Sequence, residues 1–173
     1  MAITSLEITV VAAHKNFGDA AKETLSFELM AYSSFEELEE AIREELDNLE
    51  APFDGADTGA DAWEYYVETW GDVHHNYQSL DEDLYDYVNA IDSTRYDKDI
   101  VDAAIDCDIN IADIDEAYNG SFNSDEDFTR NILDDFGYIP KDFPSWIEID
   151  WEATASNVMQ DYVESHGHYF RVL

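Results

Sequence analysis

Carboxylates are the side chains whose type and spacing could do chemistry in this sequence, and they are densest in residues 79–116. Thirteen of these 38 residues are Asp or Glu. Apolar residues recur among them at helical spacing, which disordered acidic tails lack because they have no face to bury. The segment therefore predicts short amphipathic helices that hold carboxylates in fixed positions on their outer faces. Such an array would attract a multivalent cation or a basic partner.

A calcium loop is the first specific site to test in this segment. Asp106, Asp108 and Asn110 match the first three ligand positions of such a loop. The sixth position should be Gly and is Ile111, and the twelfth should be Glu and is Ala117. Because both geometric requirements fail, the sequence does not predict a dedicated calcium site.

Histidine pairs and catalytic motifs give no stronger signal. His74 and His75 are adjacent, and adjacent residues of a strand point to opposite faces. Neither this pair nor His166 with His168 has a Cys or a third clustered ligand nearby in the sequence. Phosphate-binding loops, nucleophile elbows and zinc signatures are absent, and 42 acids guarantee many chance carboxylate pairs. We therefore expect no metal, no cofactor and no enzymatic activity. An acidic hydrolase, the alternative, would need a concave pocket that holds acids with perturbed pKa values.

The formal net charge of −34 restricts the possible partners. It far exceeds the magnitude of about 2–8 that suits a small domain, and such charge destabilises a compact chain by self-repulsion. Nucleic acid and anionic membranes would be repelled, so neither is expected as a direct partner. The charge is uneven, because residues 35–116 carry 27 acids against three bases.

The compartment is predicted from cysteine and from the start of the chain. The single cysteine, Cys107, cannot form an internal disulfide, which fits a reducing compartment. The short apolar run near the N-terminus has no basic region ahead of it, and no stretch is long enough to span a membrane. We expect a cytoplasmic protein.

Periodicity and capping residues predict an α+β fold: an elongated chain of small subdomains with short antiparallel strands and short acidic helices. Strands are expected at residues 6–11, 24–30, 63–70, 146–149 and 168–172, with a hairpin turn at Gly18. Helices are expected after the N-cap residues Ser34, Ser79, Asp97, Asn110, Ser124 and Asp150, the third of the acidic helices ending near Gly120 and the last extending to Tyr162. The subdomains are predicted at 1–72 (N-terminal, α+β), 73–116 (central, acidic and helical) and 117–173 (C-terminal, α+β).

The acidic helices suggest mimicry of DNA. Duplex DNA carries one charge per about 1.7 Å of axis, so 34 charges correspond to roughly 17 base pairs. Carboxylates at i and i+4 of a helix lie about 5–6 Å apart, which approximates a row of phosphates. The acids expected to stand in for phosphates are Glu36, Glu40, Glu44, Asp47, Asp81, Asp86, Asp92, Asp99, Asp102, Asp106, Asp113 and Asp115.

The C-terminal third resembles the closing region of the ArdA antirestriction proteins. The similar segments are AYNGSFNSDEDF (117–128), FGYIP (136–140) and IDWEATASNVMQDYVESHGHYFR (149–171). Within them, the family's Tyr-x-Gly turn, I-D-[WY]-E helix start and Gly-His-x-Phe strand match Tyr118 and Gly120, Ile149 to Glu152, and Gly167, His168 and Phe170. The resemblance is best over residues 79–173, and the family's opening strands are not visible in residues 1–30.

This resemblance implies an elongated α+β homodimer that imitates bent duplex DNA. ArdA proteins bind the DNA-recognition and methyltransferase core of type I restriction–modification enzymes, so the expected partners are the methyltransferase and specificity subunits. The family's dimer contact implies interface residues at Phe128, Ile132, Phe136 and Tyr138. The alternative is a salt-adapted acidic protein-binding module without DNA mimicry, in which the acid excess only suits a very salty cytoplasm.

Overall fold

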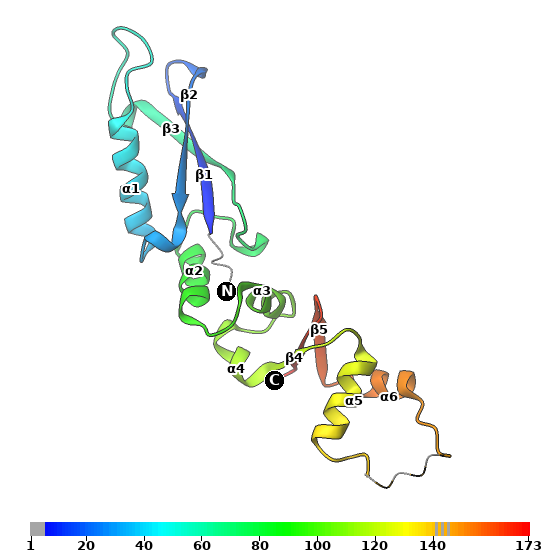
Figure 1. Ribbon diagram of the computed structural model, residues 1–173. Helices are drawn as coiled ribbons and strands as arrows, with labels where there is room; N and C mark the ends of the chain where they lie inside the picture. The colour runs from blue at the N-terminus through cyan, green and yellow to red at the C-terminus, as the bar shows by residue number, and fades with distance from the viewer. Residues whose placement is uncertain (1–5, 141, 143, 145) are drawn as a thin grey trace. The chain divides into compact units, whose positions relative to one another are not determined.

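The protein is described by a computed structural model that covers residues 6–140, 142, 144 and 146–173. The chain divides into two compact units, residues 1–95 and 96–173. Each unit combines helices with one three-stranded antiparallel sheet, so the predicted α+β class is confirmed (Figure 1). The boundary between the units falls inside the segment 73–116, which was predicted to be one subdomain. Among the described residues, no helix is long and apolar enough to cross a membrane.

The first unit is a sheet of order β2-β1-β3 with two helices. Its elements are β1 (Glu7–His14), β2 (Gly18–Glu28), α1 (Phe35–Asn48), β3 (Trp63–Thr69) and α2 (Glu82–Ser93), with 3-10 turns at Leu29–Ala31, Ala60–Ala62 and His75–Tyr77. The β1–β2 hairpin turns at Gly18, whose φ of +50° lies in the region that favours glycine. Strand β1 is central, so both of its edges are paired.

The core of the first unit follows the two expected periodicities. Alternate residues of β1 from Ile8 to His14 are fully buried, as expected for one face of a strand. Leu38, Ile42 and Leu46 form the buried stripe of α1, which lies beside the sheet (Figure 1). Tyr85 of α2 donates its hydroxyl to the Leu29 carbonyl at 3.3 Å and thereby ties α2 to the end of β2.

The second unit has a sheet of order β4-β6-β5. Its elements are α3 (Lys98–Asp106), a 3-10 turn at Ile111–Asp113, α4 (Ile114–Ala117), β4 (Tyr118–Ser121), α5 (Asp125–Asp135), α6 (Trp151–Val158), β5 (Tyr162–Ser165) and β6 (His168–Arg171). Its core is aromatic: Phe128 of α5 stacks on Tyr169 of β6 with ring centroids 4.4 Å apart. Phe122 and Tyr162 meet Phe128 edge-on, the geometry that aromatic pairs prefer.

Several sequence predictions of elements are confirmed. Ser34 and Ser124 cap α1 and α5, and Asp150 caps α6; each side-chain oxygen accepts from the backbone N–H three residues on. The hairpin at Gly18 and the strands near 6–11, 24–30, 63–70 and 168–172 are present, although β2 begins at the turn itself.

Other predicted boundaries are wrong. Helix α2 is capped by Asp81 rather than Ser79, because the backbone turns into the helix only where the buried stripe begins at Leu84. The helix expected to extend to Tyr162 ends at Val158, and Tyr162 instead begins β5. Residues 146–149 form no strand, since this exposed segment has no neighbouring strand to pair with.

The remaining two acidic helices are also shorter or differently capped than expected. Asp97 occupies the N-cap position of α3, but its side chain accepts no capping hydrogen bond. The helix expected to end near Gly120 is a 3-10 turn followed by the four-residue α4. It ends at Ala117 because the next residues pair with β6 as β4.

Candidate acidic interaction surface

The start of α1 is fixed by reciprocal hydrogen bonds. Ser34 Oγ accepts from the Glu37 N–H at 3.3 Å. The Glu37 carboxylate accepts from the backbone N–H of Ser33 at 2.8 Å and from its hydroxyl at 2.9 Å. These bonds favour the ionised form and hold the pKa of Glu37 below its usual range. The first turn of α1 is therefore both ordered and negatively charged.

Glu36, Glu40 and Glu44 are exposed and succeed one another at i, i+4 spacing on α1. Like charges at this spacing destabilise a helix by roughly 0.2–0.5 kcal/mol per pair. The buried stripe on the opposite side of α1 offsets this cost, because burying one Leu or Ile side chain contributes about 1.5–3 kcal/mol. We name these three glutamates the α1 row.

Asp47, the fourth predicted acid of α1, has a structural contact. Its Oδ1 atom accepts from the Ala60 N–H at 2.6 Å and so joins the end of α1 to the loop before β3. Asp47 is nevertheless exposed. It supports this end of α1 and also contributes charge there.

The predicted acids of α2 divide in the same way. Asp81 is half-buried, and its Oδ1 atom accepts from the Leu84 N–H at 3.3 Å. Asp86 and Asp92 lie on the exposed side of the helix, away from the buried stripe. Asp81 positions the helix, and the other two carry its outward charge.

In the second unit, the predicted acids are Asp99, Asp102, Asp106, Asp113 and Asp115. Asp102 is half-buried and pairs with Lys98 one turn earlier on α3. Asp99 is exposed but has one oxygen 3.6 Å from Nε2 of His168. The other three are exposed. Asp102 is the only one of the five whose side chain is mostly covered.

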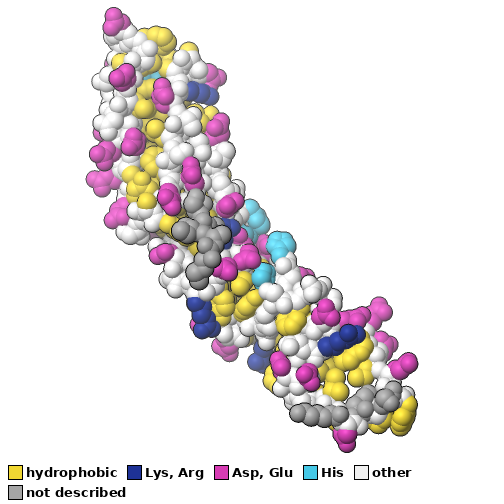
Figure 2. Space-filling view, in the orientation of Figure 1, with side chains coloured by type: hydrophobic (Ala, Val, Ile, Leu, Met, Phe, Trp, Pro, Cys, Tyr) yellow, Lys and Arg dark blue, Asp and Glu magenta, His cyan; other side chains and the backbone are white. Residues whose placement is uncertain are grey.

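Across the described residues, no Asp or Glu is buried. The first unit carries 23 acids against four bases and the second 19 against four, counted over all residues of each. Figure 2 shows Asp and Glu side chains on the visible face of both units, with few Lys or Arg among them. Each unit therefore presents a strong negative surface of its own.

A groove between α1 and β3 was not predicted from the sequence. Its volume is about 440 Å³, and it is lined by Lys15, Glu36, Glu39, Glu40, Arg43, Leu46, Ala60, Asp61, Trp63 and Tyr65. The α1 residues are spaced three or four apart, as one side of a helix requires. The two aromatic residues alternate on β3 and share one face of that strand. The spacing was visible in the sequence, but the pairing of these two faces was not.

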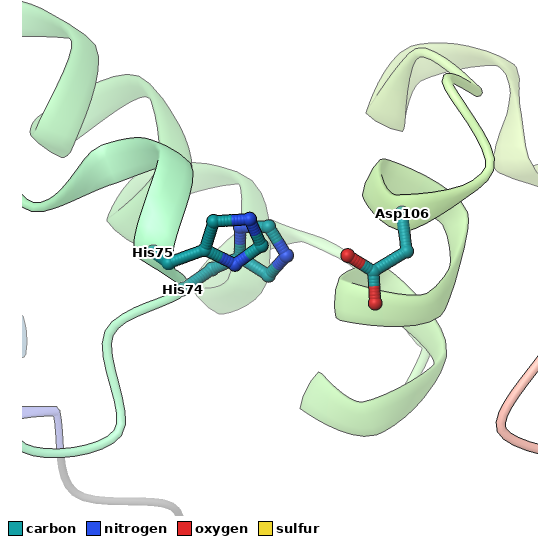
Figure 3. A group of neighbouring side chains, drawn as sticks. All are labelled: His74, His75 and Asp106. Carbon is teal, nitrogen blue, oxygen red and sulfur yellow. The ribbon is translucent and has the colours of Figure 1, made fainter.

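The histidine pair differs from its sequence interpretation. His74 and His75 lie at a 3-10 turn rather than on a strand, and their rings lie side by side with centroids 4.3 Å apart (Figure 3). His74 Nδ1 accepts from the Asn76 N–H, which caps the turn. Asp106, also drawn in Figure 3, belongs to the second unit. Within the described residues of the first unit, no third potential metal ligand accompanies the two rings.

Ser121 and His168 form a second unpredicted cluster. Ser121 Oγ lies 2.9 Å from His168 Nδ1, and the Tyr118 hydroxyl lies 3.3 Å from the same nitrogen. The Asp99 oxygen near His168 Nε2, at 3.6 Å, is beyond hydrogen-bond length. Ser121 and His168 are also direct partners in the β4–β6 ladder. The cluster therefore joins two strands and lacks the oriented base of a nucleophilic site.

The residues predicted as a dimer interface do not share one environment. Phe128 is fully buried in the aromatic core, so it supports the surface from beneath and offers no area to a partner. Ile132 is half-buried, whereas Phe136 and Tyr138 are 64% and 70% exposed. Trp146 is 81% exposed and Val172 52%, so the second unit exposes large apolar side chains that the sequence analysis did not select.

Comparison with protein-family models, curated proteins and solved structures finds no match for this chain.

Proposed function

We propose that this protein is a non-enzymatic DNA mimic that occupies the DNA-binding groove of a type I restriction–modification enzyme. The proposal rests on the α1 row, which is three exposed carboxylates at one-turn spacing on a helix whose other side is buried in the core. The resemblance of the C-terminal third to ArdA proteins supplies the enzyme class.

Electrostatics explain how such a surface would compete with DNA. Most non-specific DNA affinity comes from phosphate charge and falls steeply as salt rises. A basic groove meets the same charge pattern in ordered carboxylates, which lose less conformational freedom on binding than a disordered acidic tail. Inhibition should therefore weaken as salt rises, in parallel with the enzyme's own affinity for DNA.

The charge is distributed, so no single acid should be essential. Exposed ion pairs contribute roughly 0.2–1 kcal/mol each, and one substitution leaves the rest of the field in place. Several neutralisations together are needed for a measurable loss. Acids that also hold the fold, such as Asp81 and Asp102, are unsuitable for this test because their substitution changes structure as well as charge.

Competition measured by fluorescence anisotropy tests the proposal. A labelled duplex bound by a type I methyltransferase should be released as the protein is added at about 50 mM salt, and less so at about 200 mM. The variant E36Q/E40Q/E44Q should inhibit several-fold more weakly than the control E7Q/E23Q/E28Q, which removes the same charge from β1 and β2. If the wild-type protein leaves the DNA bound at both salt concentrations, the proposed target is wrong.

The salt-adapted module is a second candidate because the acid excess extends over both units. A protein that depends on salt to screen its self-repulsion should unfold at about 0.01 M ionic strength, where the Debye length is about 30 Å. A DNA mimic should keep its helical circular dichroism there and bind its target more tightly. Unfolding at low salt would favour the second candidate.

We also propose that two copies of the chain associate through the second unit. This rests on the implied ArdA dimer and on the exposed side chains of Phe136 and Tyr138. Apolar groups of this size are usually covered when they cluster on a surface. Sedimentation of the wild-type protein across a concentration series tests it, and a monomer at all concentrations contradicts it.

A further inference from the structure

We infer that the groove between α1 and β3 receives an arginine side chain from the protein partner. This inference rests on the proposed function, because it names one anchor within the partner's basic surface. Two properties of the groove carry it: a net negative lining and an aromatic wall.

The lining of the groove carries more acids than bases. Glu36, Glu39 and Glu40 are exposed and form no ion pair with any described residue. The two bases of the groove are turned to Asp61 instead: Lys15 Nζ donates to its carbonyl at 2.7 Å, and Arg43 pairs with its carboxylate at 3.4 Å. Four acids against two bases give the groove lining a formal charge of −2, which favours a cation from outside.

The aromatic wall suits a flat cation. Tyr65 is 37% exposed and lines the groove, so part of its ring is open to an occupant. Burial and the nearby Glu39 carboxylate raise the pKa of Tyr65, which keeps the phenol neutral beside a negative charge. A guanidinium can lie over an aromatic ring while it donates two parallel hydrogen bonds to a carboxylate. Lysine makes neither planar contact, so arginine should bind better.

Trp63 provides a reporter group in the groove wall. Its side chain is 4% exposed, and its indole N–H has no acceptor among the described residues. Buried donors are rarely left unpaired, and an unpaired one costs about 1–3 kcal/mol. Trp63 is part of the groove wall, but its indole nitrogen exposes less than 1 Å², so a carbonyl of an occupant does not reach it. The indole N–H signal can therefore report on an occupant of the groove without bonding to it.

Nuclear magnetic resonance of the full ¹⁵N-labelled chain tests the inference directly, with N-acetyl-arginine methylamide as the probe. The indole N–H signal of Trp63, identified by its loss in W63F, should shift saturably as the probe is added at low salt. The citrulline analogue has the same shape without the charge and should produce no saturable shift. The lysine analogue should bind more weakly than the arginine probe.

Matched variants separate the groove from the general negative field. E36Q/E39Q/E40Q should weaken probe binding about tenfold, because it removes the carboxylates that would pair with the guanidinium. E45Q/E50Q/E68Q removes the same charge from outside both the groove lining and the α1 row, and should leave binding within about twofold. Tyr65→Ala should also weaken binding, whereas Tyr66→Ala on the other face of β3 should not.

Equal loss in the two triple variants, or no saturable shift in the wild-type chain, would overturn the inference. Because the probe assay contains no enzyme and no DNA, its result is separate from the competition assay. Probe binding without DNA competition would contradict the DNA-mimic proposal but support the arginine groove. If the probe does not bind and both triple variants weaken DNA competition equally, the arginine groove is wrong and the DNA-mimic proposal stands.

Discussion

Helices α1 and α5 begin with the same local chemistry and end at different surfaces. In each, a serine oxygen accepts from the N–H three residues on, and acids fill the first turn. Along α1, charge continues outward as the α1 row. After α5, the chain exposes Phe136 and Tyr138 instead. Capping and acidity therefore set where a helix starts, whereas the residues further along decide what kind of partner its unit can bind.

The two units also build their cores differently. The first unit buries mainly aliphatic side chains from β1, α1 and α2. The second depends on a ring cluster centred on Phe128. A single ring in that cluster touches several others, so the loss of one ring should destabilise the second unit strongly. The loss of one aliphatic contact should destabilise the first unit less.

The largest expected effect is therefore the loss of Phe128. Phe128→Ala should lower the free energy of unfolding of the second unit by about 3–5 kcal/mol, because it opens a cavity beneath Tyr169 and removes three ring contacts. Hydrogen exchange read by mass spectrometry reports the two units separately. Exchange should accelerate in residues 96–173.

Phe136→Ala is the matched control, since it removes the same ring from an exposed position. It should change unfolding by no more than about 0.5 kcal/mol but weaken association between copies in sedimentation. Equal destabilisation by the two variants would contradict the division between core and surface rings. It would also return Phe128 to the candidate interface.

A smaller effect is expected at alkaline pH, and it acts on both units. Burial raises the pKa of Tyr85 in the first unit, and burial with a hydrogen bond to Asp125 raises that of Tyr169 in the second. The folded chain thus keeps its protons above the unfolded value of about 10, so stability falls as pH rises beyond it. At pH 11 the loss should be about 1.4 kcal/mol for each tyrosine.

Denaturant unfolding at pH 8 and pH 11 checks this, with Tyr85→Phe and Tyr169→Phe as paired variants. Each should remove its own share of the alkaline loss, although Tyr85→Phe should also lose its hydrogen bond to the Leu29 carbonyl at neutral pH. Alkaline loss unchanged in both variants would show that other groups titrate.

The sequence predicted those parts of the fold that depend on neighbouring residues. The cap at Ser34 and the stripe from Leu38 to Leu46 involve contacts within a few residues, so spacing alone identifies them. β5 was missed because its only signal is a short apolar stretch before the turn at His166 and Gly167, and its stability comes from pairing with β6.

The candidate site also combines features that depend on neighbouring residues with features that depend on tertiary contacts. Outward acids such as Glu36 and Glu40 could be selected from helical spacing. The structural contacts of Asp47 and Asp102 could not be foreseen, since one depends on a loop 13 residues away and the other on the burial of its helix face. The groove required knowing that α1 lies beside β3, a tertiary contact that no local pattern encodes.

The smallest expected effect concerns the N-cap positions of α2 and α3, each of which is occupied by an Asp. Asp81 accepts a hydrogen bond from its helix, whereas Asp97 occupies the same position of α3 without one. Asp81→Ala should therefore cost about 1 kcal/mol, and Asp97→Ala only a few tenths from the lost interaction with the helix dipole. Ser79→Ala should cost little, because Ser79 lies outside α2.

Denaturant unfolding of the three variants at one salt concentration measures these costs. Equal costs at Asp81 and Asp97 would mean that charge near the helix start, rather than the capping bond, stabilises these helices; a large cost at Ser79 would mean that α2 begins earlier than the structure has it.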